Sequence, residues 1–504
     1  MIPIPTTAFV READAYTIQF EPVASIDLME RAATALFRKL LPKLLPDQKV
    51  VVFAGHGNNG GDGLVLARLL MQQAFNPDVF VLEIGTPSPD FSHNLSRLRA
   101  MGKEVQLIQS ESDFPEGLPT GTIVLDALFG SGLTRPLTGL AARLVSYINS
   151  LDVVVIAVDM PSGLMADEPV DLKKDMIIQA DYTYTFEWPK MAFFFPENEF
   201  FVGNWEIVQI GLHPDMHQTT AENALLTAAD IKPMLRNRSR FSHKGTFGHG
   251  LIIAGSADKS GAAVLAARAS MRSGAGLLHA HLPGAAVLPF QSQLPEVMVS
   301  RDVNENHVSR LPGLDLFTAI GIGPGIGQAT ETANSLKLLI QQTKVPMVLD
   351  ADALNLLAAN PTWLAFLPKQ TILTPHPGEF VRLAGKAADS FERHRLLRNF
   401  AIRHGLIVVL KGAFTSIALP DGRIFFNPTG NPGMATGGSG DVLTGIILGF
   451  LAQSFQPVEA ALAGVYLHGL AGDLALASQS QESLLAGDIT EHLGKAFDKL
   501  RQQV

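Results

Sequence analysis

A repeated order of segments constrains the fold of this chain more than any other feature of the sequence. Short runs of apolar, often β-branched residues alternate with helical patterns, and polar or glycine-rich turns follow the runs. This alternation is typical of βαβ units, in which helices cover a parallel sheet. The strand-like runs are residues 50–54, 79–84, 123–126 and 153–159 in the first half, and 251–254, 319–321, 347–350 and 406–410 in the second. We therefore predict an α/β fold throughout.

Length and a break in this pattern indicate two domains. A single hydrophobic core stops growing near ~250–300 residues, whereas this chain has 504. The alternation fades through a polar stretch at residues 217–223 and restarts after Lys232. We therefore predict an N-terminal domain at residues 1–225 and a C-terminal domain at residues 226–504.

Composition excludes several kinds of site. The sequence contains no cysteine, which excludes disulfides, thiolate metal sites and cysteine nucleophiles. A formal net charge of −9 argues against a nucleic-acid surface. The first residues lack the pattern of a secretory signal, and the apolar runs are shorter than the ~20 residues that cross a bilayer. We expect a cytoplasmic homo-oligomer that binds small molecules, with neither a membrane nor a nucleic-acid partner.

The first candidate site begins at a glycine-rich segment, residues 55–63, between a predicted strand and a helix predicted from residue 64. Backbone N–H groups and the helix dipole at such a turn can bind a phosphate. The glycines alone indicate a tight structural turn equally well. Asn58, Asn59 and Asp62, however, add polar groups that a turn does not need.

Further polar residues follow the next predicted strands of this half. Asp126 precedes the segment 130–136, and Asp159 precedes Ser162. Either aspartate by itself indicates a helix cap or a turn. Because the carboxyl ends of parallel strands meet in one crevice, the residues together predict a ligand site.

The second half carries a corresponding set of glycine and polar clusters. They lie at residues 244–250, 255–268, 321–325, 350–355, 374–379 and 411–415. The small residues 261–267 alone indicate close helix packing, and His376 alone indicates an ordinary loop histidine. Clusters at so many expected strand ends favour one shared ligand site.

The glycine-dense segment 427–441 is the most informative part of this half, and it leads into an apolar helical segment at 442–450. Glycines let backbone N–H groups turn toward an anion at a helix N-terminus, so a phosphoryl group fits there. Asp441 opens the helix and is placed to deprotonate a hydroxyl that attacks phosphorus. The alternative role is a helix cap worth ~1 kcal/mol. The preceding glycines favour catalysis.

The first half resembles the NAD(P)H-hydrate epimerase family through N-N-G-G-D-G, D-A-L-F-G-S-G-L-T-R-P and A-V-D-M-P-S-G, in this order. The resemblance implies a Rossmann-like three-layer domain, with Asp159 as acid/base near the reacting ring. It implies that a potassium ion orders the loops through oxygen ligands from Asn59, Asp126 and Ser162. It implies that the hydrated dinucleotide is bound by Asn58, Asn59, Gly60, Gly61, Asp62, Gly130, Ser131, Gly132, Leu133, Thr134, Arg135, Pro136 and Asp159.

The second half resembles ADP-dependent NAD(P)H-hydrate dehydratase through K-G-T-F-G, G-I-G-P-G, D-A-D-A-L-N, T-P-H-P-G-E, L-K-G-A and N-P-T-G-N-P-G-M-A-T-G-G-S-G-D. The resemblance implies a ribokinase-like α/β domain that phosphorylates the hydroxyl of the S hydrate with ADP and then eliminates phosphate, leaving AMP. The implied hydrate contacts are Ala262, Gly323, His376 and Asp441, and the implied nucleotide contacts are Lys411, Gly412, Ala413, Phe414, Thr415 and Gly440. Magnesium would bridge the phosphates, with Glu379 as a candidate ligand.

Two other functions compete with this interpretation. The anion-hole motif G-S-G-D is shared with ribokinase-like vitamin and sugar kinases, which release a stable phosphorylated product. Domains that resemble the first half also occur in non-catalytic binding scaffolds, among them an RNA-decapping scaffold and a lipoprotein-associated protein. Intact Asn59, Asp126, Asp159 and Ser162 favour catalysis, and the acidic sequence pI of about 5.9 argues against an RNA surface.

Overall fold

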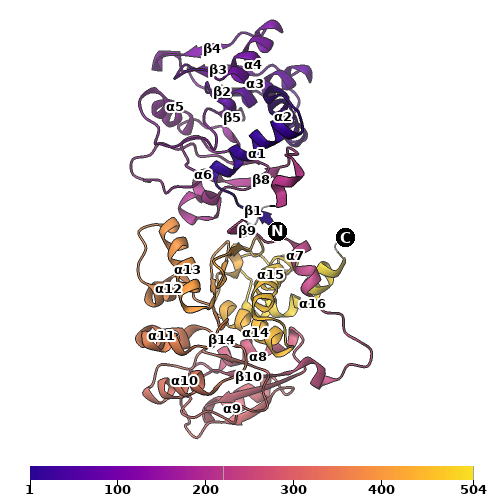
Figure 1. The fold of residues 1–504 in the computed structure, drawn as a ribbon, viewed down its shortest axis with the longest axis vertical. Helices are drawn as coiled ribbons and strands as arrows, with labels where there is room; N and C mark the ends of the chain where they lie inside the picture. Colours follow the sequence, from indigo (N-terminus) through magenta and orange to yellow (C-terminus); the bar gives the residue numbers. More distant parts are fainter. Residues whose placement is uncertain (219–220, 503–504) are drawn as a thin grey trace. The chain divides into compact units, whose positions relative to one another are not determined.

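The computed structural model describes residues 1–218 and 221–502, which fall into two compact units (Figure 1). One unit comprises Pro3–Ala221, and the other comprises Met1–Ile2 with Glu222–Val504. The strand β9 (Asn223–Leu225) precedes the boundary predicted at residue 225. It nevertheless belongs to the second unit, because it pairs in parallel with β18 (Ile424–Phe426). No helix in the described ranges has the length and apolar character needed to span a bilayer.

A seven-stranded sheet forms the centre of the N-terminal unit, in the order β4-β3-β2-β5-β6-β7-β8, with parallel neighbours throughout. The strands are β2 (Val50–Ala54), β3 (Asp78–Leu82), β4 (Gln106–Ile108), β5 (Ile123–Ala127), β6 (Val154–Val158), β7 (Tyr182–Phe186) and β8 (Asn204–Val208). The helices are α1 (Thr7–Phe20), α2 (Ser25–Leu40), α3 (Asn58–Gln72), α4 (Pro89–Ala100), α5 (Gly139–Asn149) and α6 (Glu199–Val202). The chain winds outward in both directions from β2 and β5, so ligands of such a sheet bind where these two strands end.

The helix that follows β2 begins earlier than the sequence predicts. The segment 58–63 forms the first turns of α3 rather than a loop before it. Gly60 permits this arrangement, because a Cβ at that position would lie 1.7 Å from the carbonyl oxygen of Gly55. The N-terminus of α3 therefore packs directly against the end of β2.

An eleven-stranded sheet forms the centre of the C-terminal unit, in the order β1-β9-β18-β17-β16-β15-β14-β13-β10-β11-β12. Its remaining strands are β1 (Ile2–Pro3), β10 (His249–Ile253), β11 (Leu277–Leu282), β12 (Met298–Arg301), β13 (Ala319–Ile322), β14 (Met347–Leu349), β15 (Ile372–Leu373), β16 (Ile407–Leu410) and β17 (Ser416–Ala418). The strands from β10 to β16 run parallel, whereas β17 is antiparallel to both neighbours, which the sequence did not predict. The winding reverses between β10 and β13.

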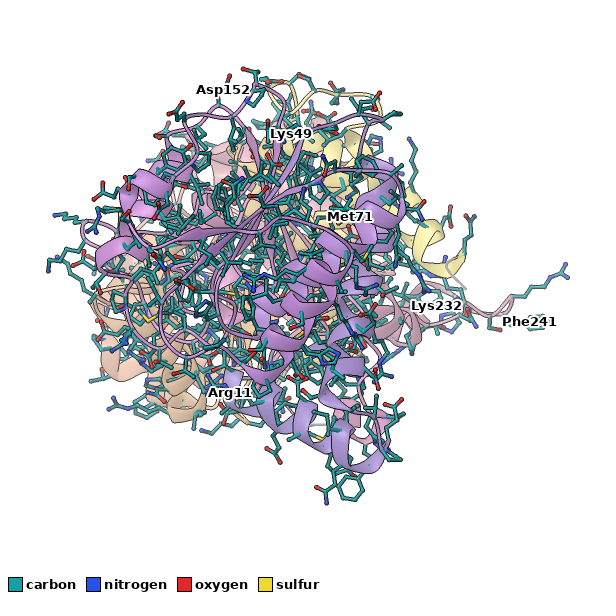
Figure 2. The ribbon with its side chains drawn as sticks, turned by 90° about the horizontal axis from the view of Figure 1, so that it is seen from above. Arg11, Lys49, Met71, Asp152, Lys232 and Phe241 are labelled. Atoms are coloured by element: carbon teal, nitrogen blue, oxygen red, sulfur yellow. The ribbon has the colours of Figure 1, made fainter. Side chains whose placement is uncertain are left out.

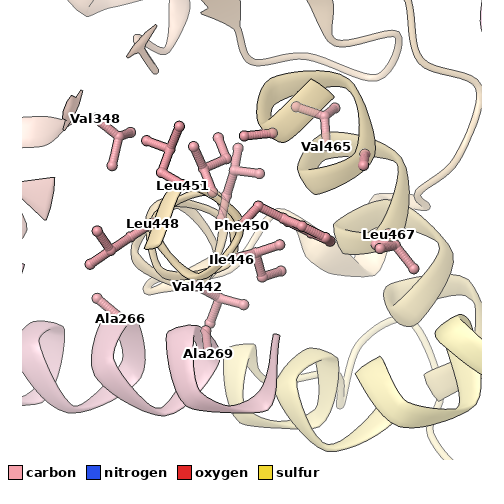
Figure 3. Close-up of a cluster of buried hydrophobic side chains, with 14 of the residues drawn as sticks. Ala266, Ala269, Val348, Val442, Ile446, Leu448, Phe450, Leu451, Val465 and Leu467 are labelled. Atoms are coloured by element: carbon pink, nitrogen blue, oxygen red, sulfur yellow. The ribbon is translucent and has the colours of Figure 1, made fainter. Parts of the chain in front are cut away.

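Helix α14 (Ser439–Ala452) is the central helix of this unit and is buried from Val442 to its end. Figure 3 shows Ala266 and Ala269 of α8 (Ser260–Arg272) on one side of it and Val465 of α15 (Pro457–Ala475) on another. The other helices are α7 (Ala228–Ile231), α8 (Ser260–Arg272), α9 (Gly284–Gln293), α10 (Thr330–Gln342), α11 (Ala351–Ala359), α12 (Pro377–Ala384), α13 (Ser390–His404), α15 (Pro457–Ala475) and α16 (Ala486–Gln502). A helix that is apolar on all sides is held firmly by its neighbours, so the residues of its first turn are well placed to form a site.

One segment extends away from this unit, between residues 235 and 243. Phe241 lies at its tip and is 91% exposed (Figure 2). The base of the segment is anchored, because the guanidinium of Arg236 lies over the ring of Phe455 and that of Arg238 over the ring of Phe247.

Candidate functional sites

Asp126 lies at the carboxyl end of β5, next to the point where the N-terminal sheet reverses its winding. Its side chain is fully buried, and Ser162 binds both carboxylate oxygens. The Ser162 hydroxyl donates to Oδ1 at 2.6 Å, and the Ser162 backbone N–H donates to Oδ2 at 2.8 Å. Burial raises the pKa of Asp126 to about 6, although the bonds from Ser162 act to lower it. The structure thus brings these two predicted residues together.

Asn59, in the first turn of α3, approaches the loop that follows β5. A Cβ added to Gly130 would lie 3.1 Å from Asn59 Cγ. Asn59 is 9% exposed, and within the described residues neither Oδ1 nor Nδ2 has a hydrogen-bond partner. Because a buried polar atom without a partner is costly, this amide is suited to contact a ligand.

Asp159 is held by a buried lysine, Lys190, which the sequence interpretation missed. The ammonium of Lys190 donates to Asp159 Oδ1 at 2.8 Å, and the N–H of Ser131 donates to Oδ2 at 3.2 Å. Burial acts to raise the pKa of Asp159, but the charge and hydrogen bond of Lys190 outweigh it and hold that pKa below its usual range. The backbone φ of Asp159 is +65°, which is uncommon for residues other than glycine and frequent at functional sites.

Two further carboxyl groups near Asp159 have raised rather than lowered pKa values. Burial, and then the charges of Asp159 and Asp14, raise the pKa of Asp62 well above its usual value. Burial and the charge of Asp159 raise the pKa of Asp14, in α1, to about 6, with Lys190 opposing. The site therefore combines one carboxylate that stays ionised with carboxyl groups that keep their protons to higher pH, a combination typical of acid–base sites.

The other predicted residues of this half divide between the start of α3 and the loop after β5. Gly60 and Gly61 are buried and Asn58 is exposed. In the loop, the exposed positions are Gly132, Thr134, Arg135 and Pro136, and Leu133 is half-buried. The sequence did contain a signal for Lys190: it is the one basic residue in an otherwise apolar run from Trp188 to Phe195, and lysine is rarely buried unless it is paired.

In the C-terminal unit, a cavity of about 460 Å³ lies where the sheet reverses its winding, between the loops after β10 and β13. Its lining residues are Asp258, Lys259, Gly261, Ala262, Gly325, Ala351, Asp352, Asn355, Glu379 and Asp441. Three of the predicted residues, Ala262, Glu379 and Asp441, are therefore brought together in one cavity.

Asp441 lies in the first turn of α14, with its carboxyl group at this cavity. Burial raises the pKa of Asp441 to about 7, the negative charges of Asp350 and Asp352 add to this rise, and the positive charge of Lys411 opposes it. A carboxylate with a pKa near the working pH is suited to accept a proton and to release it again.

Lys411, at the end of β16, is predicted to hold the nucleotide, and its ammonium lies close to Gly440. A Cβ added to Gly440 would lie 3.1 Å from Lys411 Nζ. The same Nζ donates to Asp350 Oδ1 at 2.9 Å. The rest of the predicted nucleotide segment forms a turn closed by Thr415, whose hydroxyl donates to the Gly412 carbonyl at 3.0 Å, and both Gly412 and Ala413 are exposed. Phe414 is half-buried in this turn.

His376 and Gly323 lie in segments next to the cavity. His376 caps α12. Its ring Nδ1 accepts the backbone N–H of Gly378 at 3.0 Å, and its backbone N–H donates to Glu379 Oε2 at 2.8 Å. Gly323 directly follows β13, and a Cβ there would lie 1.9 Å from the carbonyl oxygen of Asp350. Capping orients the His376 ring, and its contact with the hydrate remains a prediction.

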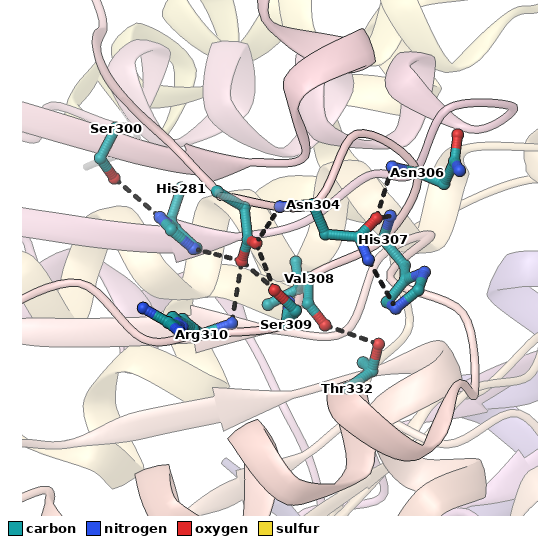
Figure 4. Close-up of polar contacts among 10 residues, drawn as sticks. His281, Ser300, Asn304, Asn306, His307, Val308, Ser309, Arg310 and Thr332 are labelled. Carbon is teal, nitrogen blue, oxygen red and sulfur yellow. Dashed lines mark hydrogen bonds and ion pairs between the residues drawn. The ribbon is translucent and has the colours of Figure 1, made fainter.

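Asp302 organises a loop next to one wall of the cavity. Figure 4 shows the polar contacts in this loop, including those of His281, Asn304 and Ser309. Its carboxylate accepts the N–H groups of Asn304 and Ser309 at 2.9 and 2.8 Å and lies 3.1 Å from His281 Nε2. The carbonyl of Asn306 in this loop accepts the N–H of Ala257 at 2.9 Å. Because Ala257 adjoins the lining residues 258–259, this network indirectly fixes the cavity wall.

Two family models match the chain. One is described as YjeF-related protein N-terminus and matches residues 25–192, and the other is described as NAD(P)H-hydrate dehydratase and matches residues 250–495. The bifunctional NAD(P)H-hydrate repair enzyme of Moorella thermoacetica is 36% identical over 522 residues, which cover 99% of this chain and 97% of that protein. This chain belongs to the family of bifunctional NAD(P)H-hydrate repair enzymes. The family predicted from the motifs is confirmed.

Solved structures resemble the dehydratase half of this repair-enzyme chain. A ribokinase-like superfamily protein of Enterococcus faecalis is 29% identical, with a TM-score of 0.50, and the match covers 56% of this chain and 99% of that chain. The predicted ribokinase-like fold of the C-terminal unit is thereby confirmed. The ADP/ATP-dependent NAD(P)H-hydrate dehydratase of Bacillus subtilis, co-crystallised with ATP and Mg²⁺, is 35% identical, with a TM-score of 0.49 and coverage of 55% of this chain and 98% of that chain.

Proposed function

We propose that the N-terminal unit interconverts the R and S epimers of hydrated NADH and NADPH, and that the C-terminal unit dehydrates the S epimer with ADP. The observation that carries the proposal is the position of Asp441. It lies at the start of a buried helix, at a cavity of about 460 Å³, with a pKa of about 7. Asp441 can therefore accept the proton of a substrate hydroxyl at neutral pH.

The dehydration proceeds in two steps. The substrate hydroxyl attacks the β-phosphorus of ADP, Asp441 accepts the hydroxyl proton, and the bond from phosphorus to the AMP oxygen breaks. The carbon–oxygen bond of the new phosphate ester then breaks, and the adjacent carbon loses a proton, so the dihydronicotinamide ring and inorganic phosphate result. Phosphate is a far better leaving group than hydroxide. Lys411 and the N–H group of Gly440 are placed to offset the charge of the transferring phosphoryl group.

Magnesium is suited to this cavity together with the nucleotide. Proteins usually hold Mg²⁺ with one or two carboxylates plus phosphate and water oxygens. We assign Glu379, which is 5% exposed in the cavity lining, as the protein ligand. When bound, the ion would neutralise phosphate charge.

For epimerisation we assign the proton-accepting role to Asp159, which Lys190 keeps ionised. The matching donor is Asp62, whose pKa is raised well above its usual value, or Asp14, whose pKa is raised to about 6. Loss and return of water, or opening of the ring, both need a proton to move at the substrate. One acceptor and one donor in the same site supply it.

Potassium is suited to the neighbouring cluster of oxygens. The amide oxygen of Asn59 is buried without a partner in the described part of the chain, and the side chains of Asp126 and Ser162 are bonded to each other nearby. Amide, carboxylate and hydroxyl oxygens are the donors that an alkali cation prefers. When bound, the ion would supply the positive charge that orders the loops after β5 and β6.

One experiment tests both activities. The purified protein is mixed with each hydrate epimer, with and without ADP or ATP, while dihydronicotinamide absorbance and nucleotide products are followed. We expect the S epimer to recover absorbance only with nucleotide, with one AMP released per molecule repaired when ADP is used. The R epimer should recover absorbance after the N-terminal unit converts it to the S epimer. A stable phosphorylated product without recovery of absorbance would instead identify a ribokinase-like kinase.

A further inference from the structure

Asp350 opens the motif D-A-D-A-L-N and has no role in the reaction described so far. It follows β14, is 1% exposed, and occupies the N-cap position of α11. An aspartate at this position normally accepts an N–H from the first turn of its helix. Within the described residues, however, the Asp350 side chain makes no such cap bond. Its orientation is therefore set by contacts outside α11.

Two side chains from other elements bind the Asp350 carboxylate. Oδ1 accepts a proton of Lys411 Nζ at 2.9 Å, and Oδ2 accepts the hydroxyl proton of Thr444 at 2.7 Å. Thr444 lies in α14, three residues after Asp441. A Cβ added to Gly440 would be 3.1 Å from Lys411 Nζ and 3.7 Å from Asp350 Oδ2. One buried carboxylate thus joins the lysine at the end of β16 to the start of α14.

We propose that Asp350 is a positioning residue for phosphoryl transfer, which holds Lys411 beside Gly440 and fixes the first turns of α14 without touching the substrate. This inference rests on the dehydration proposed above. Lysine has a long, flexible side chain with several rotatable bonds, so a lone Lys411 would populate other positions. The pairing restricts its ammonium to the place where phosphoryl charge develops.

Asp350 also influences the protonation of Asp441. The charged or titratable groups around Asp441 are Asp350, Asp352, Lys411 and, in the neighbouring cavity wall and helix, Asp258, Lys259, Glu379 and His468. Burial lowers the pKa of His468 to about 4, so that side chain is neutral at working pH. Removing the negative charge of Asp350 would therefore lower the pKa of Asp441, whereas removing an uncharged structural contact would not.

The test is Asp350→Asn in the full-length protein, which keeps the shape and a partner for Thr444 but removes the charge. At saturating substrates we expect the kcat of dehydration to fall by ~10- to 100-fold, with ADP affinity by calorimetry ~10-fold weaker. The pH at which dehydration reaches half its maximum should move down by about one unit. Epimerisation on the same preparation should be unchanged, which checks folding and concentration.

The matched control is Asp389→Asn, at the N-cap of α13, where the side chain accepts the N–H of Glu392 at 2.8 Å. Asparagine caps helices as well as aspartate does, so this variant should match the wild type in rate, pH profile and ADP affinity. If Asp350→Asn lowers the rate while its pH midpoint and ADP affinity stay at wild-type values, Asp350 has only a structural role. A wild-type rate would overturn the inference as well.

A double variant keeps the inference testable if Asp350→Asn fails to fold. Lys411→Met leaves the buried Asp350 carboxylate without its cationic partner, although the bond from Thr444 remains, and adding Asp350→Asn should restore stability. Since Asp350 acts through Lys411, the double variant should dehydrate no more slowly than Lys411→Met alone, whereas an additive loss would contradict the inference. If the wild type shows no ADP-dependent dehydration, the proposed function fails. The positioning role of Asp350 is then tested by ADP affinity alone, and equal affinities for the wild type and Asp350→Asn would overturn it.

Discussion

In each unit a lysine binds an aspartate that follows a parallel strand, yet the pKa values of the two proposed catalytic aspartates, Asp159 and Asp441, shift in opposite directions. In the N-terminal unit Lys190 donates directly to Asp159 at 2.8 Å, and the pKa of Asp159 falls. In the C-terminal unit Lys411 donates to Asp350 at 2.9 Å, and the pKa of Asp441 rises to about 7. Burial acts to raise the pKa of both proposed catalytic aspartates, but Lys190 pairs directly with Asp159 and outweighs it there, whereas Lys411 pairs with Asp350 and only partly offsets it at Asp441.

This difference matches the chemistry proposed for each site. Epimerisation needs an acceptor that is always ready and a separate donor, and Asp159 with Asp14 or Asp62 provides both. Phosphoryl transfer needs one group that takes a proton from a hydroxyl, and a raised pKa makes Asp441 a stronger base than an exposed carboxylate.

The largest effect is expected from Asp441→Asn, which preserves shape but removes the proposed proton acceptor. Dehydration should fall by ~10² to 10⁴, while epimerisation and ADP binding persist, because the first site lies in the other unit and the N–H groups of α14 remain. Both rates and ADP affinity are measured on one preparation. In the structure Gly438, not Asp441, occupies the N-cap of α14, and no side chain among the described residues caps this helix. A variant that dehydrates at nearly the wild-type rate would therefore show that Asp441 is not the proton acceptor.

A loss of ~10- to 100-fold in epimerisation is expected from Lys190→Met, with dehydration unchanged. Without its ammonium, buried Asp159 would take up a proton and no longer accept one from the substrate. The control is Lys39→Met, which breaks the exposed ion pair with Glu206 in the same unit. Rates are compared after circular dichroism confirms folding. Equal epimerisation rates in Lys190→Met and Lys39→Met would contradict the role of Lys190 in keeping Asp159 ionised.

A weaker dependence on potassium should follow from Asp126→Ala. The apparent potassium affinity of epimerisation should fall by at least ~10-fold, since one of three proposed oxygen ligands is lost. Dehydration of the pure S epimer should not change. The exposed Asp152→Ala serves as the control, and titration of epimerisation with potassium is the measurement. Identical titration curves for Asp126→Ala and wild type would reject Asp126 as a ligand.

The pH profiles of the two activities should run in opposite directions. Dehydration should rise as the pH passes about 7, because Asp441 must lose its proton before it can act. Epimerisation should decline as the pH rises above about 6 if Asp14 is the donor. We expect changes of ~10-fold between pH 6 and 8. Parallel profiles measured on the same protein would show that a shared property, such as stability, controls both rates.

The smallest effect concerns stability. Because the folded-state pKa of Asp441 lies above its unfolded value, the folded state holds this proton more tightly, so the stabilisation is present at low pH and is lost as the pH rises through about 7. Asp441→Asn should therefore raise the Tm of the C-terminal unit by about 1–3 °C at pH 8 and by less at pH 5. Calorimetry at both pH values checks this, and a variant less stable at pH 8 would contradict it.

Local patterns in the sequence determined most of the architecture. Apolar runs revealed β2, β3, β5, β6, β10, β13, β14 and β16, because buried parallel strands consist of consecutive apolar residues. Glycines before a helix, with Asp441 at its first turn, indicated a phosphoryl site. The order of the motifs placed the chain in its family, which the comparison over 99% of the chain confirms.

The tertiary structure alone decided which side chains meet. Lys190 is 31 residues from Asp159 and Lys411 is 61 residues from Asp350, and only strand order brings each pair within hydrogen-bond distance. The start of α3 at Asn58 likewise depends on a close approach between Gly60 and Gly55. Periodicity reports burial and local backbone conformation, whereas the pKa of a buried aspartate depends on the charge packed against it, which can come from any part of the chain.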